Sequence, residues 1–209
     1  MSHVDDLMSN DFSLLHCNVR SLYKNIDKLE EIVSPCSKPP DIIALSETRI
    51  KETSIIAPLP GYNFISRRKS QTQAGGVGAH IKNNLKYLQR RDIQFKMCGC
   101  ENIWFELLGK RQKIIIGIVY RHPQYNIDEF LQSCSETTAK IAKNNCAYYV
   151  LGDININLLN ATNDNRKQQY IDTLCQLCQT RGPVEGFVRP SLGFRCSKCI
   201  LYTDNLPLF

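Results

Sequence analysis

The chain has 209 residues, of which 43% are hydrophobic and 22% charged, and its formal net charge at pH 7 is +6. These values are ordinary for a globular protein and predict one domain that buries about 70% of the surface of its unfolded chain. The apolar runs are too short to span a bilayer and the acidic start is not a signal peptide, so we expect an intracellular protein, nuclear or cytoplasmic, with no membrane partner.

The first part of the chain predicts two buried strands joined by a helix, after a loose leader over residues 1–11. Residues 13–19 predict a strand that ends near Asn18, and residues 41–47 predict a second strand with Glu47 at its end. Between them, apolar residues recur with the roughly 3.6-residue period of a helix, at Leu22, Ile26, Leu29, Ile32 and Val33. Both strands therefore end in a polar side chain.

The middle of the chain predicts strands, turns and one further helix. We expect strands over residues 62–68, 102–108 and 113–120, the last two as an antiparallel pair, and a helix over residues 128–144. Gly75-Gly-Val-Gly78 opens a strand that continues to Ile81. A hairpin turn is favoured there over a phosphate cradle, because no helix pattern follows it. Strands and helices alternate irregularly, which predicts a mixed α/β layered fold.

Basic residues are concentrated in residues 53–91, which contain no acidic residue. The block carries a charge of +7, so the rest of the chain sums to about −1, and its members are Arg67, Arg68, Lys69, Lys82, Lys86, Arg90 and Arg91. Such a block is typical of a surface that binds a polyanion, and we expect Arg67, Arg68 and Lys69 to contact nucleic acid. A solvated basic surface without a partner is the alternative.

Residues 149–155 form an apolar run that ends in Gly-Asp-Ile-Asn. The pattern predicts a strand buried on both faces, and Asp153 and Asn155 point to the same side on an extended chain. Gly152 leaves room for the close approach of another chain or a ligand. The alternative is a local Asx-turn, which Asp and Asn favour. A third helix is expected over residues 167–180.

Polar residues thus follow four predicted strands, at Asn18, Glu47, Tyr120 and Asp153 with Asn155. The motifs over residues 16–22, 40–48, 75–78, 119–123 and 151–155 resemble those of the endonuclease/exonuclease/phosphatase superfamily. More closely, the chain resembles the apurinic-type endonuclease domain of non-LTR retrotransposons over residues 12–175. The resemblance implies an α/β (α+β) fold, a four-layer sandwich of two mixed β-sheets flanked by helices over residues 12–180. Residues 181–209 would be a divergent or truncated tail in which the C-terminal strands are incomplete.

The resemblance also implies a Mg²⁺-dependent phosphodiesterase that nicks DNA, with Mn²⁺ as an alternative ion. Its parent would be a longer polyprotein with a reverse transcriptase region. Glu47 is the matching metal ligand, and Mg²⁺ needs only one or two carboxylates because it keeps several waters. Asp153 would orient or deprotonate the attacking water, and Asn155 would hold that water or a phosphate oxygen.

Three further residues receive roles from the same resemblance. Asn18 would support the metal and phosphate side of the site. Tyr120 would donate a hydrogen bond to the phosphate, where negative charge builds in the transition state. Arg121 would add a phosphate contact.

One part of the family's pattern is missing from this chain. The family closes its site with Ser-Asp-His, whereas this chain has no histidine after residue 122. Residues 202–209 resemble the closing motif with Asp204 retained and Asn205 in place of the histidine, or else the sequence after about Gly182 is unrelated. An amide cannot exchange a proton near neutral pH as imidazole does, so we expect weak or absent catalysis. A catalytically dead nucleic-acid-binding remnant is the alternative, and a small-phosphoester phosphatase is a weaker one.

The tail also offers a zinc spacing among the ten cysteines of the chain. Seventeen residues separate two Cys-x-x-Cys pairs, which are Cys175, Cys178, Cys196 and Cys199. Thiolates in this pattern suit tetrahedral Zn²⁺ and would staple the tail. The competing interpretation is favoured: Cys175 and Cys178 continue the apolar face of the predicted helix, and the cysteines are mostly free, buried thiols in a reducing compartment.

Overall fold

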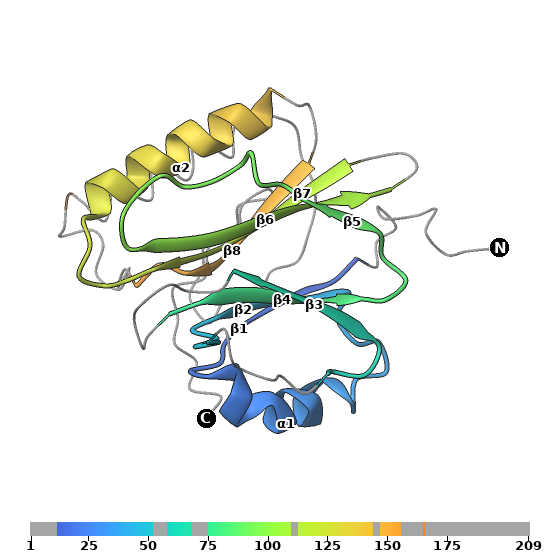
Figure 1. The fold of residues 1–209 in the computed structure, drawn as a ribbon. Coiled ribbons are helices and arrows are strands. Elements are labelled where there is room, and N and C mark those ends of the chain that lie inside the picture. Colours follow the sequence, from blue (N-terminus) through green and yellow to red (C-terminus); the bar gives the residue numbers. More distant parts are fainter. Residues whose placement is uncertain are drawn as a thin grey trace.

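Two four-stranded β-sheets stack face to face, and one helix covers the outer face of each (Figure 1). The computed structural model describes residues 12–51, 58–67, 75–109, 113–143, 147–155 and 165. The order of layers is helix, sheet, sheet, helix. The predicted four-layer sandwich of two mixed sheets flanked by helices is therefore confirmed.

The first sheet has the strand order β1-β2-β4-β3. Its members are β1 (Leu14–Asn18), β2 (Ile42–Ser46), β3 (Tyr62–Arg67) and β4 (Val77–Lys82). Strands β1 and β2 are parallel because α1 (Leu22–Val33) forms the crossover between them, whereas β2, β4 and β3 pair antiparallel. The buried face of α1 presents Leu22, Ile26, Leu29 and Val33 to the sheet, while Ile32 is 37% exposed.

The second sheet has the order β5-β6-β7-β8. Its members are β5 (Tyr87–Gln89), β6 (Cys100–Leu108), β7 (Lys113–Arg121) and β8 (Ala147–Asp153). The predicted antiparallel pair is β6 and β7, and the crossover helix α2 (Ile127–Ala142) makes β7 and β8 parallel. The sequence pattern missed β5, because three residues are too short to show an alternation.

The core between the sheets is built from the inner faces of both. It includes Ile42 and Ala44 from β2 and Ile116, Ile118 and Leu151 from the second sheet. Strand β8 is the one whose apolar run predicted burial on both faces, and its other buried residues pack under α2.

The close approach predicted at Gly152 is also present. A Cβ at this position would collide with the carbonyl oxygen of Val119 on β7, and Gly152 has φ of 153°. Only glycine fits there without moving one strand away from the other.

The two parallel pairs place their carboxyl ends at one edge of the sandwich. Asn18 ends β1, Glu47 follows β2, and Tyr120 lies beside Asp153 in the β7–β8 register. This edge gathers the predicted polar residues, as open α/β sheets do at the carboxyl ends of their strands.

The remaining predictions divide between the described residues and the rest of the chain. No described helix has the length and apolar character that crossing a membrane would require. Within the described ranges, five cysteines are free thiols, of which Cys17, Cys100 and Cys134 are buried and Cys36 and Cys98 exposed. The predicted leader, the helix over residues 167–180 and the tail lie outside the described residues.

Candidate active site

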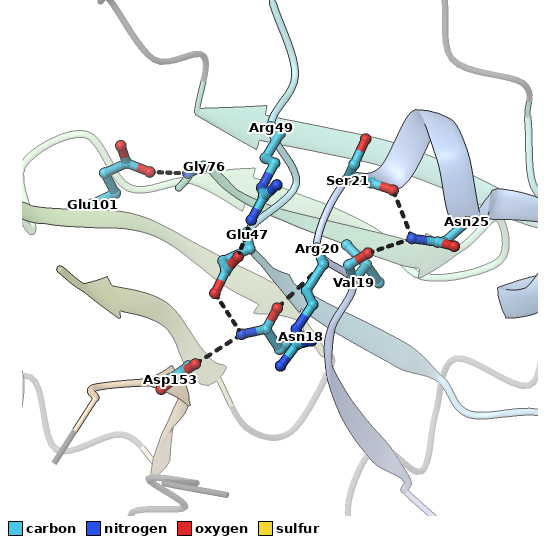
Figure 2. A network of polar contacts seen from close by, with 10 residues as sticks. All are labelled: Asn18, Val19, Arg20, Ser21, Asn25, Glu47, Arg49, Gly76, Glu101 and Asp153. Atoms are coloured by element: carbon cyan, nitrogen blue, oxygen red, sulfur yellow. Dashed lines mark hydrogen bonds and ion pairs between the residues drawn. The ribbon is translucent and has the colours of Figure 1, made fainter. Parts of the chain in front are cut away.

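Asn18 joins the two predicted acidic residues of the site (Figure 2). Its Nδ2 donates to Oε1 of Glu47 at 3.0 Å and to Oδ2 of Asp153 at 2.8 Å. One amide from the first sheet therefore holds a carboxylate from each sheet. Three residues that the sequence predicts for the site are in direct contact.

Glu47 lies in a turn that neighbouring backbone groups fix. Glu47 and Arg49 both have φ of 51°, a left-handed conformation that costs a non-glycine residue on the order of 1 kcal/mol or more. Thr48 N donates to Gly76 O at 3.1 Å, and Arg49 N donates to Gly75 O at 2.8 Å. The direction of the Glu47 side chain thus depends on the glycine pair of the predicted hairpin turn.

The start of α1 supports the same turn from the other side. Ser21 N donates to Glu47 O and Leu22 N to Thr48 O, each at 2.9 Å. Arg20 lies just before these residues with φ of 43°, and its backbone N donates to Asn18 Oδ1 at 3.2 Å. Both arginine-bearing turns, at Arg20 and Arg49, flank the carboxylate pair (Figure 2).

Asp153 is only 3% exposed. Burial raises its pKa, and the negative charge of Glu47 adds to this, while hydrogen bonds from Asn155 N and the Asn18 amide act in the opposite direction. A carboxylate with a raised pKa is closer to the range in which it can accept a proton near neutral pH.

Tyr120 and Asn155 complete the predicted group. Burial, followed by the charges of Glu47 and Asp153, raises the pKa of Tyr120 to about 12, against a hydrogen bond with Asn155 that lowers it. The hydroxyl therefore stays protonated and can donate. Asn155 N also donates to Asp153 Oδ1 at 2.9 Å, so the local Asx-turn is present as well. The turn and the site occupy the same residues.

The donor set of the site fits a hard cation. Over the described ranges, no three His, Cys, Asp or Glu side chains form a group suited to a metal ion. Glu47 and Asp153 are nevertheless held together by Asn18, and one or two carboxylates suffice for Mg²⁺ or Mn²⁺ with its waters. Zn²⁺ sites in proteins are built mainly from thiolate and imidazole ligands, which this pair of carboxylates lacks.

Arg121 does not lie where a phosphate could reach it, so this prediction is corrected. Its side chain is 1% exposed, and its guanidinium donates to the carbonyls of Ile154, Asn155, His122 and Tyr125. A buried guanidinium with these acceptors ties the end of β7 to the segment that carries Asn155. The sequence could not distinguish this role, because both roles place an arginine after Tyr120.

The basic block is partly neutralised by acidic residues from outside it. Lys82 pairs with Asp41 at 2.9 Å, and Arg90 pairs with Asp92 and Glu106 at 2.7 and 2.6 Å. Arg67 is exposed, and its Nη1 donates to the Asn102 carbonyl at 3.1 Å. Arg68 and Lys69 lie outside the described residues, as do Asp204 and the four cysteines of the zinc pattern.

Three residues of the site were missed by the sequence analysis. Arg49 pairs with Glu47 at 2.8 Å, Glu101 accepts a hydrogen bond from Gly76 N, and His122 lies 3.4 Å from Glu101 through its Nε2. Glu101 is opposite Tyr120 in the β6–β7 register, so the strand alternation contained a signal for it. Arg49 had no such signal.

The sequence matches no protein-family model. It also matches no curated protein. Solved structures resemble it instead. The endonuclease domain of TRAS1, a telomere-specific non-LTR retrotransposon, is 15% identical with a TM-score of 0.57, over 79% of this chain and 72% of that one.

Two further structures show the same likeness. The AP endonuclease LMAP from Leishmania major is 16% identical with a TM-score of 0.61, over 79% of this chain and 66% of that one. D. rerio TDP2 complexed with a single-strand DNA product is 12% identical with a TM-score of 0.51, over 76% and 64%. At these identities the likeness establishes the fold. Together with the two mixed sheets, it shows that the chain has the fold of the endonuclease/exonuclease/phosphatase superfamily.

Proposed function

We propose that the chain is a divalent-metal-dependent phosphodiesterase that cuts DNA. The observation that carries the proposal is the Asn18 amide, which holds Glu47 and Asp153 together at the carboxyl ends of two parallel strand pairs. Structural neighbours that include an endonuclease domain and an AP endonuclease support a nuclease-type activity.

Each residue has a chemical task in this proposal. Glu47 binds the metal ion, Mg²⁺ or Mn²⁺, which when bound supplies positive charge beside the scissile phosphate. Asp153 orients the attacking water and accepts its proton, which its raised pKa favours. Tyr120 donates from its protonated hydroxyl to a phosphate oxygen, and Asn155 holds Asp153 and the water in line.

Arg49 binds the phosphate in place of Arg121, which is buried. Its side chain is 41% exposed and lies 2.8 Å from Glu47 through its Nη2. A guanidinium at the rim of the site can turn from the carboxylate to a phosphate, which it matches with two parallel hydrogen bonds.

Turnover in this chain is expected to be weak. The resemblance places Asn205 where the family has its closing histidine, and an amide cannot supply a proton as imidazole does. A protein that holds DNA without cutting it is the second candidate, and the same observation favours it. The proposal includes a longer parent polyprotein in which a reverse transcriptase region accompanies this chain.

The test is nicking of supercoiled plasmid with Mg²⁺ or with a chelator. Asp153→Asn keeps the shape of the side chain but removes the base, and Asp27→Asn, on the exposed side of α1, is the matched control. Slow, metal-dependent nicking that Asp153→Asn abolishes and Asp27→Asn retains is the expected result. Salt-sensitive DNA binding without nicking supports the second candidate, and loss of both activities overturns both.

A further inference from the structure

We infer that Glu101, supported by His122, is a positioning residue that fixes Glu47 through the glycine pair Gly75–Gly76. The inference rests on the proposed function, since it concerns the carboxylate assigned to the metal ion. Its evidence is a continuous set of contacts that leads from the second sheet to the Glu47 turn of the first.

The first step of this connection crosses between the sheets. Glu101 lies on β6 opposite Tyr120 of β7, and its Oε2 accepts a hydrogen bond from Gly76 N (Figure 2). Its Oε1 lies 3.4 Å from His122 Nε2, and the two side chains are 17% and 9% exposed. A half-buried carboxylate with these partners has little freedom to move.

The second step is the glycine pair itself. Gly75 and Gly76 have φ of 100° and 94°, where other residues are strained. A Cβ at Gly75 would lie 2.9 Å from both Glu101 carboxylate oxygens and from His122 Cε1. A Cβ at Gly76 would meet the Thr48 hydroxyl. The backbone therefore approaches Glu101 on one side and the Glu47 turn on the other.

The third step reaches the turn. The carbonyls of the glycine pair accept from Thr48 N and Arg49 N, on the two residues that follow Glu47. Because Glu47 and Arg49 are both left-handed, the turn keeps its shape only while its surroundings hold it. Glu101, on the opposite sheet, holds the glycine pair to which this turn is hydrogen-bonded. Residues that orient a metal ligand in this way commonly change metal affinity by about 10- to 100-fold when they are lost.

The experiment compares Glu101→Leu with Glu101→Gln. Glutamine keeps an acceptor for Gly76 N and a polar contact to His122, whereas leucine keeps only the size of the side chain. Mn²⁺ affinity is measured without DNA by water-proton relaxation, and amide hydrogen exchange is followed at Thr48 and Arg49. Unfolding curves of both variants confirm that they fold.

Glu101→Leu is expected to weaken Mn²⁺ binding by about 10-fold or more and to speed exchange at Thr48 and Arg49. Glu101→Gln should stay within about threefold of the unsubstituted chain for metal binding. Unchanged exchange and affinity in Glu101→Leu overturn the inference, and so does equal weakening by both variants, which would mean that charge and not the hydrogen bond matters. If the unsubstituted chain binds no Mn²⁺, the proposed function fails, while the exchange rates still decide whether Glu101 holds the turn.

Discussion

His80 lies in β4 with 0% of its surface exposed and contacts the rings of Tyr62 and Phe64. Neither ring nitrogen has a hydrogen-bond partner within the described part of the chain. Burial lowers the pKa of His80 from 6.5 to about 4, because the charged imidazolium would lose its water. The residue is therefore neutral in the folded protein and gains a proton readily only when the chain unfolds.

We expect His80 to make the protein sensitive to acid. A pKa lowered from 6.5 to about 4 contributes stability that is present above pH 6.5 and is lost, up to about 3 kcal/mol, as the pH falls towards 4. His80→Leu should flatten this loss, although His16, whose pKa burial also lowers to about 4, keeps part of it. Urea unfolding at pH 7, 5.5 and 4.5 measures the difference. Parallel pH profiles for the two chains would show that His80 does not titrate this way.

Some residues of the site could be predicted from the sequence pattern and others could not. Asn18, Glu47, Tyr120 and Asp153 each lie at the end of an apolar run, so strand ends marked them as candidates and the family resemblance predicted that they meet. Glu101 is the second residue of the long strand β6, so only the strand alternation and no strand end pointed to it. Its hydrogen-bond partner is a backbone N–H just before β4. Partners that are backbone groups leave no mark in the sequence.

At the scale of the strands, Gly152 sets how closely β8 approaches β7. Gly152→Ala is expected to destabilise the protein by about 1–3 kcal/mol, because the added methyl group would collide with the carbonyl of Val119. Gly61→Ala is the matched control: it also has a positive φ, of 83°, but no atom lies within 4 Å of the added Cβ. A thermal melt of each variant separates collision from backbone strain. Equal losses would mean that φ and not the neighbouring strand is responsible.

The sequence predicts well those helices and strands whose apolar residues follow a regular pattern over many positions. The 3.6-residue period predicted α1 and α2, and uninterrupted apolar runs predicted β2 and β8, because both faces of these strands are covered. The order of strands in each sheet could not be read from such patterns. It depends on which crossovers are parallel, and only the family resemblance carried that information.

At the scale of the molecule, charge is distributed differently from what the sequence suggested. Lys82 is at the end of β4 away from the glycine pair and is paired with Asp41, whereas Arg49 is at the candidate site. The basic block therefore offers less charge to a polyanion than its charge of +7 implied.

A salt titration of DNA binding tests this distribution. Loss of one phosphate contact makes the slope of log affinity against log salt shallower by about 0.9, so Arg49→Ala should reduce the slope by about this amount. Lys82→Ala should leave it unchanged, because its ammonium group is already paired. The reverse pattern would place the DNA at the opposite end of the first sheet, near Lys82.

The hydrogen bond from Asn18 to Asp153 connects residues 135 positions apart in the chain. Contacts of such long sequence separation form late, because the entropy of closing the intervening loop must be overcome first. During translation, Asp153 would emerge on the order of ten seconds after Asn18. On the ribosome, Asn18 and Glu47 are thus present for some time before Asp153 has been synthesised. The cluster of these three residues can assemble only once β8 is complete.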